Sequence, residues 1–569
     1  MPGDEAQIDR TSASVGAPII ILCAIALFAF AGIALAFWLR TIPAGNPDPR
    51  LTYNVFYFLF ARHEIAGLLV VACFNLAAAF FLLRARSTME ESQGDHMTRA
   101  GQICAAVAVI SFAIAAIGTQ LVFHDYPLTA DEYLGDFQAR IFLHGKIQAE
   151  VPLRFVDAIR VVKPIYVDYF PATHSWNATY LPVYAALRAV FQSVNLQSLL
   201  NPFLAAITIL ALYACARNIW PESKTHAVIA IALLASSSQF LIMSMTAYAM
   251  PAHLALNTIW LWLYSQSDRR AFYLAPFVGA LAIGLHQPIV HALFVLPFLA
   301  RLVFERRWHS VGIFGAIYLA GCLGWYMWKM HFQPPPALSG GESIFRLANP
   351  RMVIIQPMNL LLIVGWASLA TPFLALLGFR QFFKVPPMVQ DAILSCALSF
   401  GFYYFFYLDQ AHGWGYRYFH GALACFVLVA VAGFNRLSIL IGQRRALTLI
   451  GAGLVTSILI QLPLRCQQAE KFVRPYARTA SVLHAIPKDI VALDVRSAWY
   501  SADLIRNDPF LENRPIIVSI YGLTPRAIAV LEKSGSVQFL DEQMLARLGM
   551  FTNRPNDYRR DPFQLGQGK

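Results

Sequence analysis

The chain has 569 residues, of which 57% are hydrophobic and only 13% are charged, whereas a typical soluble domain carries about 25% charged residues. This composition excludes an ordinary soluble enzyme and predicts a polytopic membrane protein. The formal net charge of +12 does not indicate a nucleic-acid partner, because membrane proteins concentrate Lys and Arg in cytoplasmic loops and beside anionic lipid head groups.

The first apolar segment covers residues 17–39. It is longer than the apolar core of a signal peptide, and no small-residue cleavage pattern stands out. We therefore expect a retained membrane helix.

Apolar segments of this kind recur as far as residue 463. Because a span needs about 20 apolar residues, and less inside a bundle, they predict about thirteen transmembrane helices. Three of them, 251–265, 272–285 and 289–304, are short and interrupted at Pro251 and Pro288. The complete predicted set is 17–39, 64–83, 103–123, 201–216, 226–245, 251–265, 272–285, 289–304, 310–329, 358–378, 390–407, 417–434 and 446–463.

Basic residues orient these helices. With a cytoplasmic N-terminus, every internal loop is short and carries two or three Lys or Arg residues, whereas the external connections at 246–250 and 286–288 carry none. This distribution follows the positive-inside rule. The loop 40–63, which contains three arginines, departs from it, so the first two helices are oriented less securely than the rest.

The unusual polar stretches then share the non-cytoplasmic face of the membrane. Scattered polar residues would be divided between both faces, so their gathering indicates an active site on this side. The stretches are the loop 124–200, His253, 286–288, the loop 331–357 and the segment 409–417.

The tail from residue 464 to 569 lies on the same predicted side. Its apolar runs alternate with helix-like stretches, which predicts a small α/β domain. No glycine-rich phosphate loop follows the run at 490–495, so we predict no nucleotide site. The expected organisation is two helices and a cytoplasmic loop in 1–102, a transmembrane catalytic domain in 103–463, and the extracytoplasmic domain in 464–569.

An acidic pair, Asp131 and Glu132, opens the long external loop. A poorly solvated carboxylate at the membrane surface has a raised pKa, which suits a general base. The alternative is a helix N-terminus, where acidic residues favour the positive end of the dipole. Leu134, Phe137 and Ile141 follow at helical spacing and predict a surface-lying amphipathic helix. The two interpretations are compatible.

Three motifs here resemble those of one family. Thr-Ala-Asp-Glu-Tyr at 129–133 is followed by Phe-Gln-Ala-Arg at 137–140, by Gly-Lys at 145–146 and by a proline. Tyr-Leu-Pro-Val-Tyr at 180–184 enters the next helix, and 236–256 resembles paired helices that place a polar residue at the outer face. Together they resemble the GT-C superfamily, glycosyltransferases that use polyprenyl-phosphate sugars and include protein O-mannosyltransferases and the lipid A aminoarabinose transferase.

The likeness covers 103–463 and has two departures. Two helices precede the one that carries the acidic loop, where the family usually has one. His286-Gln287-Pro288 stands where the family often has an Arg-Pro pair, which leaves the assignment of a phosphate-binding residue open.

The segment 409–418 combines two glycines with Trp414, Tyr416 and Arg417. The aromatic side chains could stack on a sugar, and the arginine offers a planar fork for phosphate. The alternative is an interfacial loop in which the aromatics belt the membrane and the arginine snorkels. His412 lies in the same segment.

Several further residues are candidates for substrate or phosphate binding. His253 and His286 lie at the outer membrane edge, where a histidine either faces a cavity or bonds a backbone carbonyl freed beside a proline. Lys163 could meet a donor phosphate or be merely solvated. Tyr133 and Arg140 belong to the first-loop motif. Gly340-Gly341-Glu342 suggests a movable cover over a substrate groove.

The resemblance implies a membrane glycosyltransferase of the bacterial-type inner (plasma) membrane, mainly α-helical and working on the extracytoplasmic side. A polyprenyl-phosphate sugar would be the donor and a lipid, glycan or protein the acceptor, with inversion at the anomeric carbon. Asp131 would be the general base and Glu132 would assist it. Arg417, with Lys163 and His253, would neutralise the leaving phosphate.

A basic group beside that phosphate removes the strict need for a metal, so we expect no required cofactor and leave a divalent metal open. Two other classes of function stay possible. A transporter or flippase for a lipid-linked saccharide would line a path to both faces with polar residues. A non-catalytic assembly subunit would tolerate Asn at position 131.

Overall fold

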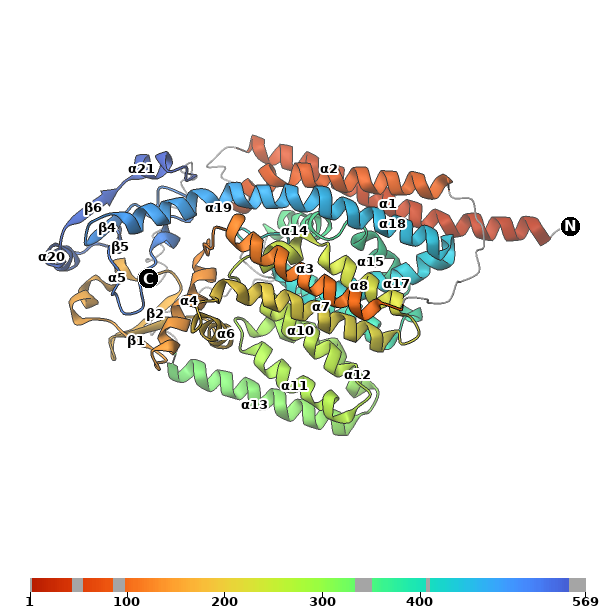
Figure 1. Ribbon diagram of the computed structural model, residues 1–569, viewed down its shortest axis with the longest axis horizontal. Coiled ribbons are helices and arrows are strands. Elements are labelled where there is room, and N and C mark those ends of the chain that lie inside the picture. The colour runs from red at the N-terminus through yellow and green to blue at the C-terminus, as the bar shows by residue number, and fades with distance from the viewer. Residues whose placement is uncertain (1–2, 43–54, 85–97, 333–349, 406–409, 552–569) are drawn as a thin grey trace.

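A computed structural model describes residues 3–42, 55–84, 98–332, 350–405 and 410–551. Most of the chain forms a helical body, and the loop 124–200 gathers with the C-terminal tail at one end of it (Figure 1). Helices α1 (Gly3–Thr41), α2 (Val55–Arg84) and the long α19 (Leu462–Ala485) lie along one edge, and α13 (Trp308–Phe332) lies along the opposite edge.

Within the described residues, all thirteen apolar segments expected from the sequence fall mainly on helices, and the last two residues of the segment 390–407 lie outside that part of the chain. The remaining helices of the body are α3 (Ala100–Leu121), α7 (Leu200–Ile219), α8 (Lys224–Ala235), α9 (Ser238–Ser244), α10 (Met250–Tyr264), α11 (Arg269–Ile283), α12 (Pro288–Phe304), α14 (Met352–Trp366), α15 (Thr371–Phe379), α16 (Pro387–Phe402), α17 (Leu423–Ile441) and α18 (Gln443–Thr456).

The number of membrane spans is not confirmed as thirteen. Among the described residues, seven helices are long and apolar enough to cross a membrane, or nine if two bent pairs each count as one span. The pair α8 and α9 bends by 62°, and the pair α14 and α15 bends by 116°. Other expected spans, such as α10 and α11, have only 15 residues each.

Both bends have a local cause. Ser237 begins a new helix because its Oγ accepts the backbone N–H of Phe240 at 3.4 Å. At the second bend, the backbone N–H of Leu369 donates to Ser457 Oγ at 2.9 Å. A helix can break at membrane depth where neighbouring side chains satisfy the freed backbone groups, and hydropathy averaged over a window does not register such a break.

The loop 124–200 is folded around helix α4 (Ala130–Leu143) and helix α6 (Val183–Gln192). Between them, strands β1 (Ala149–Glu150), β3 (Ser175–Ala178) and β2 (Val167–Phe170) form an antiparallel sheet in that order, with η1 (Leu153–Ala158) and α5 (Ile159–Val162) before β2. Helix α4 is the amphipathic helix expected from its apolar spacing.

The tail forms the small α/β domain expected from the sequence. Three parallel strands stand in the order β5 (Ile516–Ser519), β4 (Ile490–Leu493) and β6 (Val537–Leu540), with helices α20 (Pro525–Ser534) and α21 (Glu542–Arg547). The expected boundary at 463/464 falls inside one long helical run, because α18 continues into α19 through a π-helical turn at Ser457–Gln461.

The tail packs against the loop. Leu134, Phe137 and Ile141 of α4 share a buried apolar cluster with Ile490 and Ile516 of the tail. Helix α4 therefore does not lie free on a membrane surface, because the C-terminal domain covers its apolar face.

Candidate active site

The acidic pair stands at the N-terminus of helix α4. The Thr129 side chain does not cap this helix but lies 3.2 Å from the Tyr248 hydroxyl. The tail supplies a partner instead, because the backbone N–H of Ala130 donates to Asp503 Oδ1 at 2.6 Å. A carboxylate at this position matches the positive end of the helix dipole. The C-terminal domain thus fixes the start of the helix that carries Asp131.

The Asp131 carboxylate has two partners from distant parts of the chain. Arg417 Nη1 donates to Oδ2 at 3.1 Å, and the Tyr180 hydroxyl donates to Oδ1. The His286 ring lies on the Tyr180 ring, with 3.8 Å between centroids. Burial raises the pKa of Asp131, but the Arg417 charge, His286 and the two hydrogen bonds outweigh it, so the pKa lies below its usual value. Asp131 is therefore ionised at neutral pH.

Glu132 is fully buried beside it. Its Oε2 accepts the backbone N–H of Ala247 at 3.2 Å, and its Oε1 has no hydrogen-bond partner among the described residues. Burial raises the pKa of Glu132 to about 8, although the Ala247 bond opposes the shift. The expectation of a raised pKa thus holds for Glu132 and not for Asp131. Neighbouring carboxyls whose pKa values are pushed apart are typical of acid–base sites.

His412 lies behind Glu132. Its Nε2 is 3.9 Å from Glu132 Oε1 and 3.0 Å from the Tyr248 hydroxyl, and its Nδ1 is 2.9 Å from the Tyr500 hydroxyl. Burial and then the Arg417 charge lower the pKa of His412 to about 3, against a smaller effect of Asp131. A neutral imidazole held at both nitrogens positions the carboxyl rather than exchanging protons with it.

Arg417 is almost fully buried. Its guanidinium carbon lies 5.1 Å from the Tyr248 ring centroid and 5.3 Å from that of Tyr418. It borders a cavity of about 10 Å³, which His253 and His286 also line. Arg417 Nε and both ring nitrogens of His253 have no hydrogen-bond partner in the described part of the chain. Buried polar donors without partners are costly, so this corner offers donors to an added acceptor, and its volume in this structure is about that of one water molecule.

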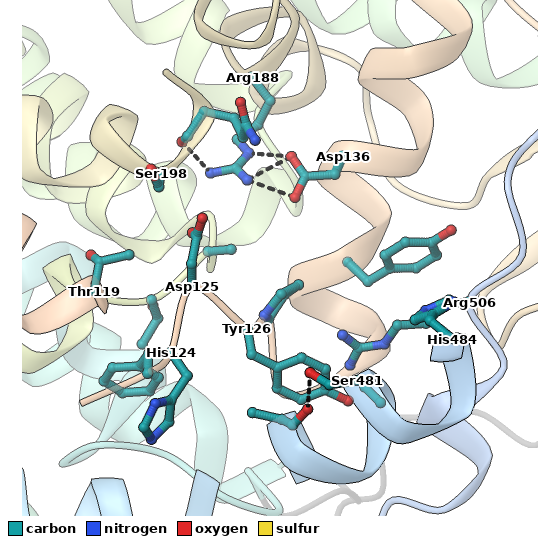
Figure 2. A pocket seen from close by; sticks show the side chains of 18 of the residues that line it. Thr119, His124, Asp125, Tyr126, Asp136, Arg188, Ser198, Ser481, His484 and Arg506 are labelled. Carbon is teal, nitrogen blue, oxygen red and sulfur yellow. Dashed lines mark hydrogen bonds and ion pairs between the residues drawn. The ribbon is translucent and has the colours of Figure 1, made fainter. Parts of the chain in front are cut away.

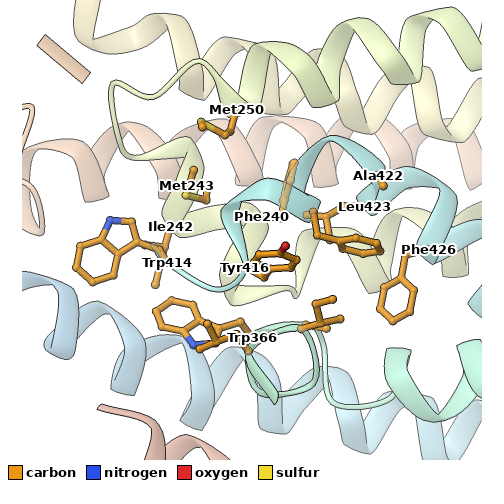
Figure 3. Packing of buried hydrophobic residues seen from close by; sticks show 14 of the residues in the cluster. Phe240, Ile242, Met243, Met250, Trp366, Trp414, Tyr416, Ala422, Leu423 and Phe426 are labelled. Atoms are coloured by element: carbon orange, nitrogen blue, oxygen red, sulfur yellow. The ribbon is translucent and has the colours of Figure 1, made fainter. Parts of the chain in front are cut away.

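Trp414 and Tyr416 are buried in the packed interior rather than presented to a ligand (Figure 3). The Trp414 ring lies 5.7 Å from that of Phe123 and 6.4 Å from that of Trp366. The side-chain amide of Gln239 donates to the backbone carbonyl of Tyr416 at 2.8 Å. Both rings therefore support the segment that carries Arg417, and neither stands open to a sugar in this structure.

Three other candidates lie away from Asp131. Tyr133 donates its hydroxyl to the backbone carbonyl of Asn507 at 2.7 Å. Arg140 forms an ion pair with Asp508 at 3.2 Å. Lys163 Nζ donates to the backbone carbonyl of Val167 at 2.5 Å, and burial lowers the pKa of this amine against the opposing charge of Asp168. The first two bind the C-terminal domain to α4. Asp409 and the proposed cover at 340–342 lie outside the described residues.

Sequence reasoning did not single out several residues that complete the site. Tyr180 belongs to a motif already noted, so its place before the helix entry was a usable signal. Tyr248, Tyr500 and Asp503 carry no local signal, because only the packing of the tail and of the 245–250 turn brings them to α4. In the described part of the chain, no group of three or more His, Cys, Asp or Glu residues could hold a metal ion.

Neither a protein-family model nor a curated protein sequence matches the chain. Solved structures do. ArnT from Cupriavidus metallidurans in the apo state is 11% identical, with 78% of this chain and 90% of that chain covered and a TM-score of 0.51. The same ArnT bound to undecaprenyl phosphate is 12% identical, with 75% and 87% covered and a TM-score of 0.48. The apo oligosaccharyltransferase of Archaeoglobus fulgidus is 14% identical, with 76% and 69% covered and a TM-score of 0.34.

The match to apo ArnT shows a shared fold. ArnT is an aminoarabinose transferase of GT-C architecture, so the resemblance found in the sequence is confirmed at the level of the fold. The fold and the apolar helices make the chain an integral membrane protein.

Proposed function

We propose that this protein is a membrane glycosyltransferase that moves a sugar from a polyprenyl-phosphate donor to an extracytoplasmic acceptor, with inversion. The observation that carries the proposal is the Asp131 carboxylate, ionised and bonded to Arg417 in a chain with the GT-C fold. The resemblance of the first loop supports the donor class. The basic internal loops support the extracytoplasmic side.

In the proposed reaction, the acceptor oxygen attacks the anomeric carbon of the donor. The bond between that carbon and the phosphate oxygen breaks, and the electron pair leaves with the polyprenyl phosphate. Asp131 takes the proton of the acceptor hydroxyl. General base catalysis of this kind needs a carboxylate that is ionised before the reaction, which the pKa of Asp131 provides.

Arg417 would serve both partners of the reaction. It pairs with Asp131 in the free protein, and a donor phosphate would compete with Asp131 for its guanidinium. The unpartnered Nε and His253 nearby would be further donors to that phosphate. A charge-assisted bond from arginine to phosphate stabilises the leaving group as its charge develops. Drawing the arginine away from Asp131 would also raise the pKa of that carboxyl and make it a stronger base.

Glu132 would assist without contacting the acceptor. It is buried and uncharged at neutral pH. It accepts a backbone N–H from the 245–250 turn and lies beside His412. Its role is to hold the turn beside α4 so that Asp131 keeps its geometry. A transporter would place polar groups along a path through the membrane, and here the described candidates cluster at one end of the helical body.

The test is sugar transfer by the purified protein in lipid, with labelled polyprenyl-phosphate sugars and a panel of acceptors. Wild type should transfer, Asp131→Asn should not, and Asp157→Asn, an exposed aspartate of the same loop, should match wild type. Transfer by a folded Asp131→Asn protein as fast as wild type would overturn the mechanism. Transfer by neither protein across several donors would favour transport or a scaffolding role.

A further inference from the structure

A second polar cleft lies between the loop 124–200, helix α19 and the C-terminal domain, with a volume of about 610 Å³ (Figure 2). It differs from the small cavity beside Arg417 and shares none of its lining residues. Its charged lining consists mainly of arginines. The arginines are Arg140, Arg188, Arg474, Arg478 and Arg506, and the acidic residues are Asp125, Asp136 and Asp508.

Two of the three aspartates in the lining each pair with one arginine, and five arginines stand against three aspartates, so the lining keeps a positive balance. Arg188 is held by Asp136, through bonds of 2.7 Å and 2.6 Å from its Nε and Nη2 (Figure 2), and Arg140 is held by Asp508. Within the described residues, Arg506 donates to two neutral acceptors, the backbone carbonyls of Asp503 and Leu128.

Two further arginines of the lining lie on α19. Arg474 pairs with Glu470, which lies outside the cleft lining, and Arg478 is an exposed side chain that lines it. The pKa of His484, which also lines the cleft, is lowered first by burial and then by the charges of Arg506 and Arg140. A water-accessible cleft with excess arginine is suited to a phosphate, which takes the planar guanidinium in two hydrogen bonds.

The cleft stands on the far side of α4 from Asp131. Arg140 comes nine residues after Asp131, and at 3.6 residues per turn this places it on the opposite face of the helix. The N-terminal end of α4 is closed by Asp503, which bonds the backbone of Ala130, and by Arg506, which bonds the carbonyl of Leu128. A ligand of this cleft would therefore not share the space of the proposed reaction.

The cleft opens at the edge of the membrane region. Thr119, in the last turn of the candidate span α3, belongs to its lining. Large apolar side chains close in sequence to lining residues are exposed: Leu121 at the end of α3 by 68%, and Val190 and Val194, which flank the lining residue Gln192, by 65% and 61%. Exposed apolar side chains at the end of a membrane span face acyl chains rather than water. Polar lining and lipid-facing surface thus adjoin.

The backbone at the rim is also unusual. His124 and Asp125, which both line the cleft, have φ values of 56° and 49°, a conformation that non-glycine residues seldom adopt. Such strain is found at ligand sites, where the surrounding structure maintains it.

We propose that this cleft binds the phosphate head group of an anionic membrane lipid, whose acyl chains lie against Leu121, Val190 and Val194. The arginines come from the loop, from α19 and from the tail. A bound phosphate therefore joins the C-terminal domain to the membrane body and stabilises α4 on the face opposite Asp131. This site is independent of glycosyl transfer.

The experiment measures equilibrium binding of dioctanoyl phosphatidic acid to the full-length protein in neutral detergent. Dioctanoylglycerol, which lacks the phosphate, and inorganic pyrophosphate, which lacks the acyl chains, are the comparison probes. The variants are Arg474→Gln/Arg478→Gln and Ser481→Glu, an exposed lining residue that would place a carboxylate in the cleft. Arg547→Gln, an exposed arginine of α21, is the matched control. Thermal unfolding of each variant checks its folding.

Phosphatidic acid should bind more tightly than either comparison probe. Its Kd should rise about tenfold or more in both cleft variants, because one loses two guanidinium groups that can bond phosphate and the other adds a carboxylate that repels it, and should not change in Arg547→Gln. Equal binding of dioctanoylglycerol would overturn the proposal, because it would make the site apolar. Equal binding of pyrophosphate would overturn it in favour of a free anion. Unchanged binding in both folded cleft variants would place the lipid elsewhere.

Discussion

Arg417 Nη1 lies 3.1 Å from Asp131 Oδ2, although 286 positions separate the two residues in the sequence. The pair joins the start of α4 to the turn before α17, and both side chains are largely buried. Arg417 also borders a cavity with two histidines, so in the proposed mechanism one buried side chain links proton removal to phosphate binding.

Replacing Arg417 should affect both steps. We expect Arg417→Gln to lower turnover by about 10²–10³-fold, the loss typical when a transition-state donor is removed, and Arg417→Lys to lose less. Because Arg417 lowers the pKa of Asp131, its removal raises that pKa. The acid limb of the profile of kcat/KM against pH should therefore move to higher pH. A Gln variant with reduced turnover and an unmoved acid limb would separate Arg417 from Asp131.

Tyr180 offers a milder perturbation of the same carboxylate. Its hydroxyl bonds Asp131 and its ring lies on His286, so Tyr180→Phe should keep the packing and lose one hydrogen bond of about 1 kcal/mol. We expect transfer to fall about tenfold or less, well short of Asp131→Asn. Tyr166→Phe is the matched control, since that half-exposed ring lies beside Tyr180. Equal rates for both variants and wild type would remove Tyr180 from the site.

Local patterns predicted the elements of this molecule better than its contacts. The spacing of Phe137 and Ile141 predicted α4 because a helical period is written in neighbouring residues. The bends inside the segments 226–245 and 358–378 were not predicted, because a serine that starts a new helix, such as Ser237, barely changes the hydropathy of a window. The tail was placed beside the site by topology, but its contact with α4 through Asp503 depends on tertiary packing alone.

The same reasoning explains the mixed outcome for the polar candidates. The expected topology placed four of these candidates at one membrane face, which limits how far apart they can be. The structure brings the four together, namely Asp131, Arg417, His286 and His253. Trp414 was interpreted by residue type, and type does not distinguish a ring that meets a ligand from one that packs against Trp366. Burial decides between these, and burial is not visible in a short segment.

Glu132 predicts a pH dependence of stability. Its pKa is about 8 in the folded chain against an ordinary value of 4.5, so the folded state keeps a proton that the unfolded state loses. Stability therefore falls as pH rises from 4.5 to 8, by at most about 1.4 kcal/mol per pH unit. Glu132→Gln has no proton to lose, so its advantage in Tm over wild type should be small near pH 4.5 and grow up to pH 8.

The matched control for this series is Glu150→Gln, because that side chain is 77% exposed in the same loop. Its Tm should follow wild type at every pH. A constant difference between Glu132→Gln and wild type across the range would mean that Glu132 does not carry the proton.

The last prediction concerns the two N-terminal helices, one more than the family pattern usually has before the acidic loop. Glu64 of α2 accepts from Arg465 Nη2 of α19 at 2.7 Å and from Trp366 Nε1 at 3.0 Å, and both charged groups are buried. Removing one partner of a buried pair leaves an uncompensated charge and costs about 3–5 kcal/mol, whereas an apolar replacement of both costs much less.

Glu64→Ala should therefore lower the Tm strongly, and Glu64→Leu/Arg465→Met should recover most of it. Because Arg465 also lies over the Trp366 ring, at 4.3 Å from its centroid, the double variant keeps an apolar contact there. Glu150→Ala, which breaks the exposed pair with Lys146, should cost less than about 1 kcal/mol. If the Tm of Glu64→Ala is no lower than that of Glu150→Ala, then this pair does not hold α2 to the core. Packing alone would then join the N-terminal helices to the fold.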